Sequence, residues 1–357
     1  MAFRVPQGSP TGFVLTASHS DSPCFRLRDH AELAGEFVRL SAERYGGMIN
    51  DSWLDRPLSV AGRVLVRREG GLETRLVDLK RDVALIPRVA IHLNRETNNG
   101  VKYDPARDLV ALYAAGTGSG SFYREVARTA DCAPEDVVAG DLVLYNNQPG
   151  TVWGPEGEFV SAPRLDDLAC VFACTEGFLT AQERDMVPVL CVFDNEEIGS
   201  ETKQGAASVF LPETLAAISE ALGLSAADHR ALLADSMMLS CDNGHARHPN
   251  HPELADTNEA PVPNGGVVVK HSPRYATDGV SAAVFTELCR RAEVPVQHYA
   301  NRPDQMGGAT LGNIADTKLP IPTVDIGMAQ LAMHSCFETM GSRDVETFVR
   351  AVRACYE

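Results

Sequence analysis

The sequence predicts an α/β protein with a β-rich segment inserted into its first half. Short apolar runs with many β-branched residues, such as Val187–Phe193, are typical of strands buried on both faces of a sheet. Helical patterns alternate with such runs after residue 159, whereas residues 28–158 contain strands that alternate apolar and polar residues. We therefore expect one domain built from residues 1–27 and 159–357, and an inserted β-rich domain over residues 28–158.

The composition argues against several classes of protein. The chain has 357 residues, of which 44% are hydrophobic, so it can bury a large core in one domain or two. Its formal net charge of −16 argues against a nucleic-acid or anionic-membrane partner. No stretch is long enough to span a bilayer, and the N-terminal MAFRVPQGSP does not have the pattern of a signal peptide.

The cysteines indicate the compartment. The chain has 9 of them, they form no CxxC motif, and most lie in apolar runs. We interpret them as reduced core thiols, not as a disulfide framework or a zinc–sulfur site. The expected location is therefore the cytoplasm, which is a reducing compartment.

The first core strand is expected over residues 11–18, and His19-Ser20-Asp21 follows it directly. A His-x-Asp pair at a strand end can place an imidazole metal ligand beside a carboxylate that fixes its tautomer. A polar turn before Pro23 is the alternative interpretation. A serine hydrolase is not indicated, because the sequence lacks a GxSxG motif.

The inserted segment is expected to be mostly strands and loops. Residues 63–79 alternate apolar and polar side chains around Gly70-Gly71, which predicts a β-hairpin. Further strands are expected over residues 83–93 and 141–145, with a polar loop over residues 94–108. His92 lies near the end of one expected strand, where a lone histidine is more often structural than part of an active site.

The core resumes at residue 159 with a helical pattern whose first turn contains Asp166 and Asp167. Helix capping explains an aspartate there without any metal. The strand Val187–Phe193 then ends in Asp194-Asn195-Glu196-Glu197. Adjacent carboxylates repel unless a cation or a proton lies between them, and ligands of open α/β sheets bind at strand carboxyl ends. A solvated acidic turn is the alternative.

The remaining C-terminal region continues the alternation. A strand over residues 237–240 ends in Cys241-Asp242, and His334 lies just beyond a buried strand at residues 321–327. The glycine-rich stretch at residues 306–313 lacks the lysine of a phosphate-binding loop, so we do not interpret it as a nucleotide site. Other strands are expected over residues 267–270 and 294–299, and helices over residues 212–222, 225–235, 277–291 and 344–356.

Carboxylates and two histidines thus recur at strand ends or helix starts. The residues are His19, Asp166, Glu196, Glu197, Asp242 and His334. Carboxylates with two imidazoles, and without thiolates, suit a hydrolytic centre of Zn²⁺, Mn²⁺ or Co²⁺. One extra carboxylate beside a ligand would supply a general base, which is the composition of a two-metal hydrolase.

Six segments, in order along the chain, resemble the aspartyl aminopeptidase family of dinuclear-zinc metallopeptidases. They are HSDSPC (19–24), SAPRLDDL (161–168), DNEEIGSETKQGA (194–206), CDNGHARHPN (241–250), PRYATD (273–278) and QLAMHS (330–335). The resemblance implies a mixed-sheet core with helices on both faces and an inserted dimerisation domain. It also implies hydrolysis of an acidic or neutral N-terminal residue from peptides.

The resemblance also implies residue roles. His19, Asp166 and Asp242 would hold one Zn²⁺, and Asp166, Glu197 and His334 the other, with Co²⁺ or Mn²⁺ as possible substitutes. Glu196 would be the general base, and Asp21 would orient His19. Tyr275 and Lys270 are expected to bind substrate, and His92 matches a histidine that reaches the active site of a neighbouring subunit. Members form dimers through the insertion, and these assemble into a homododecamer.

The chain departs from the family pattern in three places. Family members usually carry a segment before the first strand, whereas the given sequence opens almost directly at AFRVP. Asp167 stands where the family usually has Asn, and the loop GGATLG replaces a Cys-Gly-Ser/Thr form. The spacing from Lys270 to Arg274-Tyr275 is shorter than in the family, so Tyr275 is the better expected substrate contact. Two alternatives stand beside the aminopeptidase. One is a dinuclear metal dipeptidase or deacylase. The other is an inactive, scaffold-like homologue.

Overall fold

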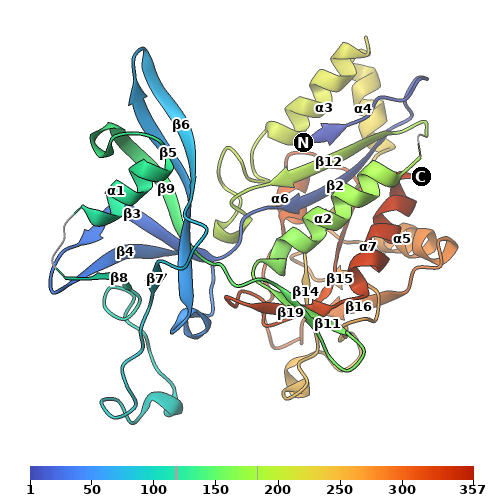
Figure 1. The fold of residues 1–357 in the computed structure, drawn as a ribbon. Coiled ribbons are helices and arrows are strands. Elements are labelled where there is room, and N and C mark those ends of the chain that lie inside the picture. Colours follow the sequence, from blue (N-terminus) through green and yellow to red (C-terminus); the bar gives the residue numbers. More distant parts are fainter. Residues whose placement is uncertain (117–119, 183) are drawn as a thin grey trace. The chain divides into compact units, whose positions relative to one another are not determined.

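The structure, a computed structural model, describes residues 1–116, 120–182 and 184–357. The chain divides into two compact units, each of which is described by itself (Figure 1). The first unit contains residues 1–22, 150–333 and 338–357, and the second contains residues 23–149 and 334–337. Among the described residues, no helix combines the length and apolar character that crossing a membrane requires.

The boundaries of the units differ from those expected at residues 27/28 and 158/159. Strand β3 (Cys24–Leu33) pairs with β4 (Phe37–Tyr45), so the second unit already begins at Pro23. Residues 334–337 also belong to this unit. The Cys336 N–H donates to Ser52 Oγ at 2.8 Å, and Asn146 Nδ2 donates to the Cys336 carbonyl at 3.0 Å. These hydrogen bonds join residues far apart in the chain, so no local sequence pattern predicts them.

The first unit is built on a mixed sheet. In it β12, β2, β13 and β17 run parallel, β15 is antiparallel to β17, and β16 is parallel to β15. The antiparallel edge strand β1 pairs with β12. In spatial order the strands are β1 (Ala2–Phe3), β12 (Val187–Phe193), β2 (Phe13–His19), β13 (Met237–Cys241), β17 (Thr323–Gly327), β15 (Val267–His271) and β16 (Val296–Ala300).

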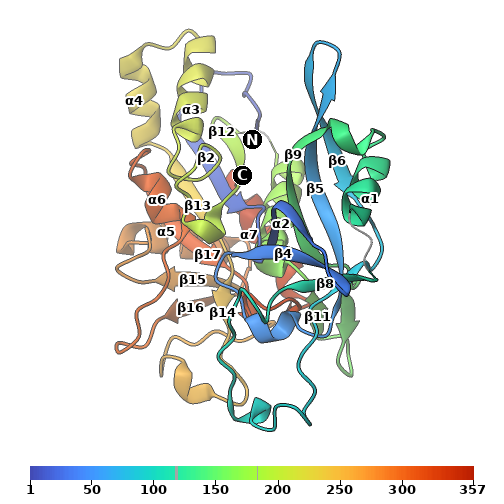
Figure 2. The same ribbon diagram turned by 90° about the vertical axis from the view of Figure 1, so that its left-hand side faces the viewer.

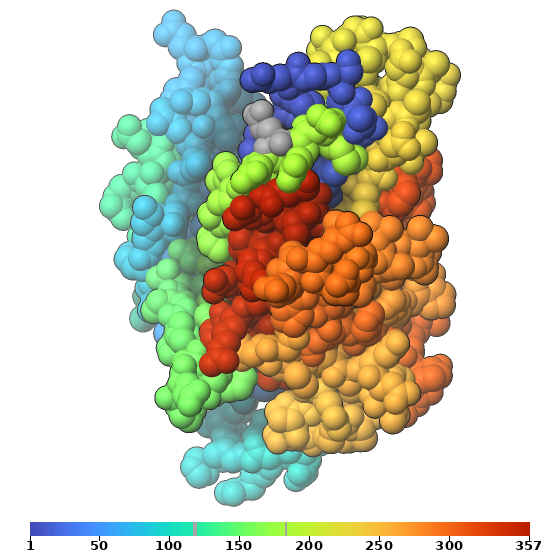
Figure 3. Space-filling view, turned by 90° about the vertical axis from the view of Figure 1, so that its right-hand side faces the viewer, coloured from blue at the N-terminus to red at the C-terminus, as the bar shows by residue number. Residues whose placement is uncertain are grey.

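Helices cover both faces of this sheet, as expected for an α/β protein (Figure 1). One core contains residues of α2 (Leu165–Thr180), α5 (Gly279–Arg291) and α7 (Asp344–Tyr356). The opposite core contains residues of α3 (Phe210–Ala221), α4 (Ala226–Ala234) and α6 (Leu311–Asp316). Strand β2 alternates between the two cores, because Val14 contributes to the first, and Phe13 and Leu15 to the second. Figure 3 shows α7, in red, packed against α5, in orange.

A smaller sheet of the first unit carries the segments next to two predicted ligands. Its strands are β10 (Thr151–Trp153), β11 (Phe159–Ala162), β19 (Glu338–Gly341), β18 (Ala329–Leu331) and β14 (Gly244–His245). Strand β11 leads into Asp166, and β14 follows Asp242. This sheet therefore holds the chain just before Asp166 and just after Asp242.

The second unit is an antiparallel sheet that closes on itself (Figure 2). Closure comes from an additional pairing of β5 with β9, and within the described ranges β6 pairs with β5 alone. Helix α1 (Ser121–Thr129) places Phe122 and Val126 in its core. The strands, in spatial order, are β6 (Gly71–Asp78), β5 (Pro57–Arg68), β7 (Ala84–Leu85), β8 (Ala111–Ala115), β4, β3 and β9 (Val137–Asn146).

Two expectations for this unit have opposite outcomes. The hairpin is confirmed, because β5 and β6 pair in register around a turn in which Gly70 has φ of +96°. The strand expected over residues 83–93 is wrong beyond its first residues, because β7 is only Ala84–Leu85. Pro87 cannot donate to a strand ladder, and the side chains of Val89 and Leu93 are exposed.

Candidate metal centre

The parallel strands of the first unit bring the predicted residues to one edge of its sheet. His19 is the last residue of β2, and Asp242 directly follows β13, the neighbour of β2. Strand β12, on the other side of β2, leads into a 3₁₀ turn that begins at Glu196 (Glu196–Ile198). Parallel neighbours end at the same edge, so these side chains come from adjacent positions, as expected for a ligand site of an α/β sheet.

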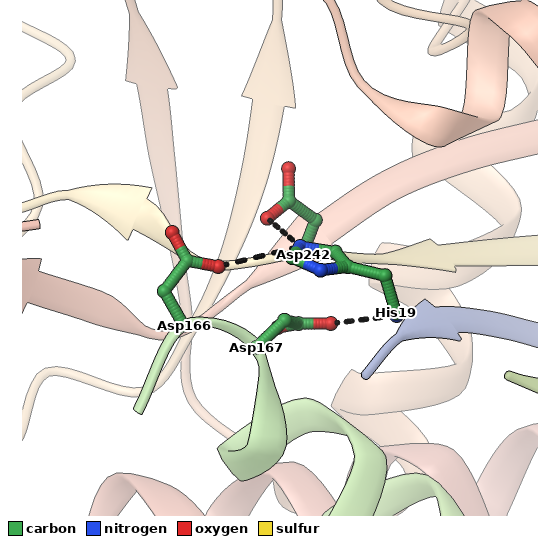
Figure 4. Close-up of side chains that lie close together, drawn as sticks. All are labelled: His19, Asp166, Asp167 and Asp242. Carbon is green, nitrogen blue, oxygen red and sulfur yellow. Dashed lines mark hydrogen bonds and ion pairs between the residues drawn. The ribbon is translucent and has the colours of Figure 1, made fainter. Parts of the chain in front are cut away.

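Three buried side chains and the half-buried Asp242 converge at this edge (Figure 4). His19, Asp166, Asp167 and Asp242 each offer one ligand atom, and these atoms lie within 4.8 Å of one another. His19 Nε2 is 3.4 Å from Asp166 Oδ1 and 3.7 Å from Asp242 Oδ1. Three carboxylates this close repel one another when ionised, so the arrangement favours a cation between them.

The orientation of His19 is set by Asp21. The ring Nδ1 lies 3.0 Å from the Asp21 carbonyl oxygen and 3.4 Å from its carboxylate. A proton on Nδ1 leaves the lone pair on Nε2, which faces Asp166 and Asp242. Burial opposes a charge on this ring, but hydrogen bonds to Asp166, Asp21 and Asp242 outweigh it and raise the pKa of His19 well above its usual value.

The same aspartate also fixes the two glutamates. The carboxylate of Asp21 accepts hydrogen bonds from the backbone N–H groups of Glu196 and Glu197, each at 3.1 Å. Burial is the main cause that raises the pKa of Glu196 to about 7, and the charge of Asp242 adds to it. Burial and the charge of Asp166 raise the pKa of Glu197 to about 10. Both shifts describe the protein without a bound cation, which would favour the ionised carboxylates.

Asp166 is common to two groups of candidate ligands. Besides the cluster with His19, its carboxylate has an oxygen within 4.8 Å of an oxygen of Glu197. His334 begins the short segment of residues 334–337 that belongs to the second unit. Its Nδ1 lies 2.7 Å from the Gly47 carbonyl oxygen. A proton on Nδ1 again leaves the ring lone pair on Nε2. The role of His334 as a ligand stays a prediction.

The remaining predicted residues have different surroundings. Lys270 is only 2% exposed, and its Nζ lies 3.1 Å from Asp242 Oδ2 and 3.3 Å from the Asn243 carbonyl oxygen. Tyr275 is partly buried, and its ring centroid is 5.5 Å from Lys270 Nζ. His92 is exposed in a turn of the second unit. The roles of all three stay predictions.

Lys270 also determines the charge of Asp242. Burial by itself would raise the pKa of Asp242, but Lys270 and His19 outweigh burial and hold the pKa below its usual value. Burial would lower the pKa of Lys270, but Asp242 is the main charge that raises it instead. Both groups are therefore charged at neutral pH.

Two carboxylates of the site were not assigned a role from the sequence. Asp167 is fully buried, and its Oδ2 accepts a hydrogen bond from the His19 N–H at 3.3 Å. Burial raises the pKa of Asp167 well above its usual value. Glu338 is also buried, and its Oε2 accepts from the Asp166 N–H at 3.0 Å. Asp167 could have been suspected from the sequence because it is adjacent to the candidate ligand Asp166, whereas Glu338 lies in none of the six motif segments.

The donor set fits zinc. Carboxylate oxygens and imidazole nitrogens are common Zn²⁺ ligands, and neither group of candidate ligands contains a thiolate. His19 and Asp166, buried at a sheet edge and held by outer hydrogen bonds, have the supported arrangement that metal ligands require.

Comparison with known proteins gives consistent matches over the whole chain. The family profile described as Aminopeptidase I zinc metalloprotease (M18) matches residues 1–356. A probable M18 family aminopeptidase 2 from Clostridium acetobutylicum is 41% identical over 358 residues, which cover 96% of this chain and 82% of that protein. A protein of the same description from Mycobacterium leprae is 39% identical over 350 residues, with coverage of 96% and 82%.

Solved structures match equally well. A chain in the cryo-EM structure of the Ape4 and Nbr1 complex has a TM-score of 0.95 at 30% identity, and the match covers 99% of this chain and 73% of that chain. The S. cerevisiae mApe1 dodecamer has a TM-score of 0.86 at 29% identity, with coverage of 99% and 81%. The predicted fold class and family resemblance are confirmed, and the chain belongs to the M18 family of zinc metalloaminopeptidases.

Proposed function

We propose that the protein is a dinuclear zinc aminopeptidase that removes an acidic or neutral N-terminal residue from peptides. The observation that carries this proposal is the position of Asp166, whose carboxylate lies both in the cluster with His19 and beside Glu197. A carboxylate shared by two sets of ligands is suited to bridge two cations. His19, Asp166 and Asp242 would hold one ion, and Asp166, Glu197 and His334 the other, with Co²⁺ or Mn²⁺ as substitutes.

When bound, the ions would supply Lewis acidity to the scissile carbonyl and lower the pKa of water in the site. The protein itself supplies the proton transfer. Glu196 is held by its backbone N–H on Asp21 and directly precedes the proposed ligand Glu197, which places beside the ions a carboxylate that can accept a proton. Glu196 would take a proton from the attacking water and deliver it to the amine of the leaving peptide.

The substrate side is proposed from the residues near Asp242. Tyr275 would contact the first residue of the peptide. Lys270 was predicted as a second substrate-binding residue, but its ammonium group is buried and paired with Asp242. We propose that Lys270 acts by holding Asp242, so that its ammonium group does not select acidic over neutral first residues. An inactive homologue would be expected to have lost ligands, but all of the predicted ligands are present.

Assembly and location are proposed on separate grounds. The mApe1 neighbour is a dodecamer, so we propose that this chain forms dimers through its second unit and a homododecamer from these dimers. His92 would then reach the active site of an adjacent subunit. Six of the 9 cysteines are buried, as expected for core thiols, which supports a reducing compartment and a cytoplasmic location.

The proposal is tested by measuring free amino acid released from peptides that begin with Asp, Glu, Leu or Lys. Each peptide is incubated with the Zn²⁺-loaded or Co²⁺-loaded protein, and again with a chelator. Metal-dependent release of the first residue is expected. Dipeptides and N-acylated amino acids are included as controls. Cleavage of these alone would replace the aminopeptidase by a dipeptidase or deacylase, and no cleavage of any substrate would support the inactive homologue.

A further inference from the structure

Asp325 is a fully buried carboxylate that the proposed mechanism does not use. It lies in the middle of β17, and its carboxylate accepts three hydrogen bonds. Ser240 Oγ and Thr310 Oγ1 each donate to Oδ1 at 2.6 Å, and the Ala276 N–H donates to Oδ2 at 2.6 Å. A buried carboxylate is costly unless such donors surround it, so the four segments involved are held together at this side chain.

Two of these segments are loops. The loop at residues 272–278 lies between β15 and α5, and it is attached by Ala276. It is also attached by Thr277, whose Oγ1 accepts the backbone N–H of Asp325 at 2.8 Å. The glycine-rich loop at residues 306–313, whose last three residues form the start of α6, is attached through Thr310, the residue before that helix. Arg274 Nη1 donates to the Gly307 carbonyl at 3.0 Å and joins the two loops a second time.

This anchor explains the glycine-rich loop, for which the sequence suggested no role. A Cβ atom at Gly312 would lie 2.6 Å from Ser240 Oγ and 2.7 Å from Asp325 Oδ1. Both distances are shorter than contacts that real Cβ atoms make. The glycine therefore lets the start of α6 approach the carboxylate. This close packing explains the glycine without a bound nucleotide.

The first of these loops, residues 272–278, lies near the candidate metal centre. The Tyr275 ring, in the first loop, is 5.5 Å from Lys270 Nζ, which is itself 3.1 Å from the candidate ligand Asp242. A displacement of Ala276 would move its neighbour Tyr275 without touching any proposed metal ligand. The chain of contacts therefore runs from Asp325 to the proposed substrate side of the centre.

We propose that Asp325 is a positioning residue that holds residues 272–278 and 306–313 together as one wall of the site for the first residue of the peptide. This inference rests on the proposed function, because only that function assigns Tyr275 to the substrate. The anchor itself is a property of the fold and can be measured without any substrate.

The test is Asp325→Asn, which keeps the shape of the side chain. The amide oxygen can still accept from Ser240 and Thr310, but the amide nitrogen would face the N–H of Ala276, so that two donors meet. Loss of this one hydrogen bond is expected to raise KM by about tenfold for peptides with acidic and neutral first residues. Metal content and kcat should stay close to those of the wild type.

Ser240→Ala is the matched control, because it removes a donor to the same carboxylate from β13 and leaves both loops attached. It is expected to lower the melting temperature without raising KM. Thr310→Val removes the attachment of the glycine-rich loop and should raise KM like Asp325→Asn. Equal KM values for Asp325→Asn and the wild type, or an equal rise in Ser240→Ala, would overturn the positioning role.

Amide hydrogen exchange of the metal-loaded protein supplies a readout that does not depend on activity. Asp325→Asn should speed exchange in peptides covering residues 272–278 and 306–313, and leave β12 unchanged. Unchanged exchange in both loops would show that Asp325 does not anchor them, whatever the kinetics. A wild-type protein that cleaves no peptide would remove the substrate role together with the proposed function, while the exchange data would still decide the anchor.

Discussion

Lys270 Nζ lies 3.1 Å from Asp242 Oδ2 in a partly buried ion pair, while Asp242 Oδ1 faces His19. The two oxygens of one carboxylate thus have different partners. One is held by an ammonium group, and the other points to the candidate cation site. Outer partners of this kind orient metal ligands and adjust their affinity for the metal.

Replacing Lys270 tests whether its charge serves the metal or the substrate. In Lys270→Met, Asp242 loses its buried counter-charge, so Zn²⁺ affinity is expected to fall by about 10- to 100-fold. Affinity is measured by titration of the metal-free protein, and activity at saturating Zn²⁺. Because the ammonium is already paired, the ratio of activity on Asp-initiated to Leu-initiated peptides should not change. A selective loss on Asp-initiated peptides would show instead that Lys270 binds the acidic side chain.

Glu196→Gln removes the proposed general base but keeps the size of the side chain. Its turnover is expected to fall by about 10²- to 10⁴-fold, because proton transfer by a positioned group contributes on this order. Elemental analysis should find the metal content of the wild type. The exposed neighbour Glu201, changed to Gln, serves as the control and should retain activity. A metal-loaded Glu196→Gln protein that retains activity would remove Glu196 from this role.

Asp166 and its neighbour Asp167 provide a matched pair of substitutions. Asp166→Asn should abolish binding of both ions, because its carboxylate lies in both groups of candidate ligands. Asp167→Asn introduces the residue that the family usually has and should retain them. Elemental analysis of both variants after Zn²⁺ loading and desalting checks this. Two ions per chain in Asp166→Asn would contradict the bridging assignment.

The raised pKa values of the glutamates predict opposite pH dependence for the metal-free and Zn²⁺-loaded proteins. Glu196 and Glu197 have pKa values of about 7 and about 10, against an ordinary value of 4.5, so the folded metal-free protein binds more protons than the unfolded chain. The contribution of these two groups to the stability of the metal-free protein should therefore be largest below pH 4.5. It should be lost as the pH rises through 7 towards 10.

A bound cation reverses this trend, since it favours the ionised carboxylates. The increase in melting temperature on adding Zn²⁺ should therefore be larger at pH 8 than at about pH 6, and binding should release protons. Thermal unfolding at a series of pH values, with and without Zn²⁺, measures both curves. The same increase at every pH would mean that these glutamates do not lose protons when the metal binds.

Several features could be predicted because they depend on neighbouring residues. Val187–Phe193 forms β12 with the expected bounds, since an apolar run of this length is stable only when buried. Gly70 and Gly71 locate the β5–β6 hairpin because a turn needs their backbone conformation. The strand over residues 83–93 was wrong because Pro87 and exposed apolar side chains are compatible with a loop as well.

Other features depend on contacts between distant parts of the chain. Lys270 and Asp242 are 28 residues apart, Ala276 and Asp325 are 49 apart, and Ser240 and Asp325 are 85 apart. No periodicity or motif links such positions. The inclusion of residues 334–337 in the second unit was likewise not predicted, because it results from contacts with Ser52 and Asn146.

The sequence by itself determined the class of fold and the chemistry available at the strand ends. Its apolar runs define where the chain enters and leaves the sheet, and the residues at those points are carboxylates and histidines. Only the tertiary structure decided which oxygen of Asp242 faces the candidate cation site, and which segments donate hydrogen bonds to Asp325. The physical reason is that strand formation depends on local burial patterns, whereas the partners of a buried charge are chosen by the packing of segments far apart in the chain.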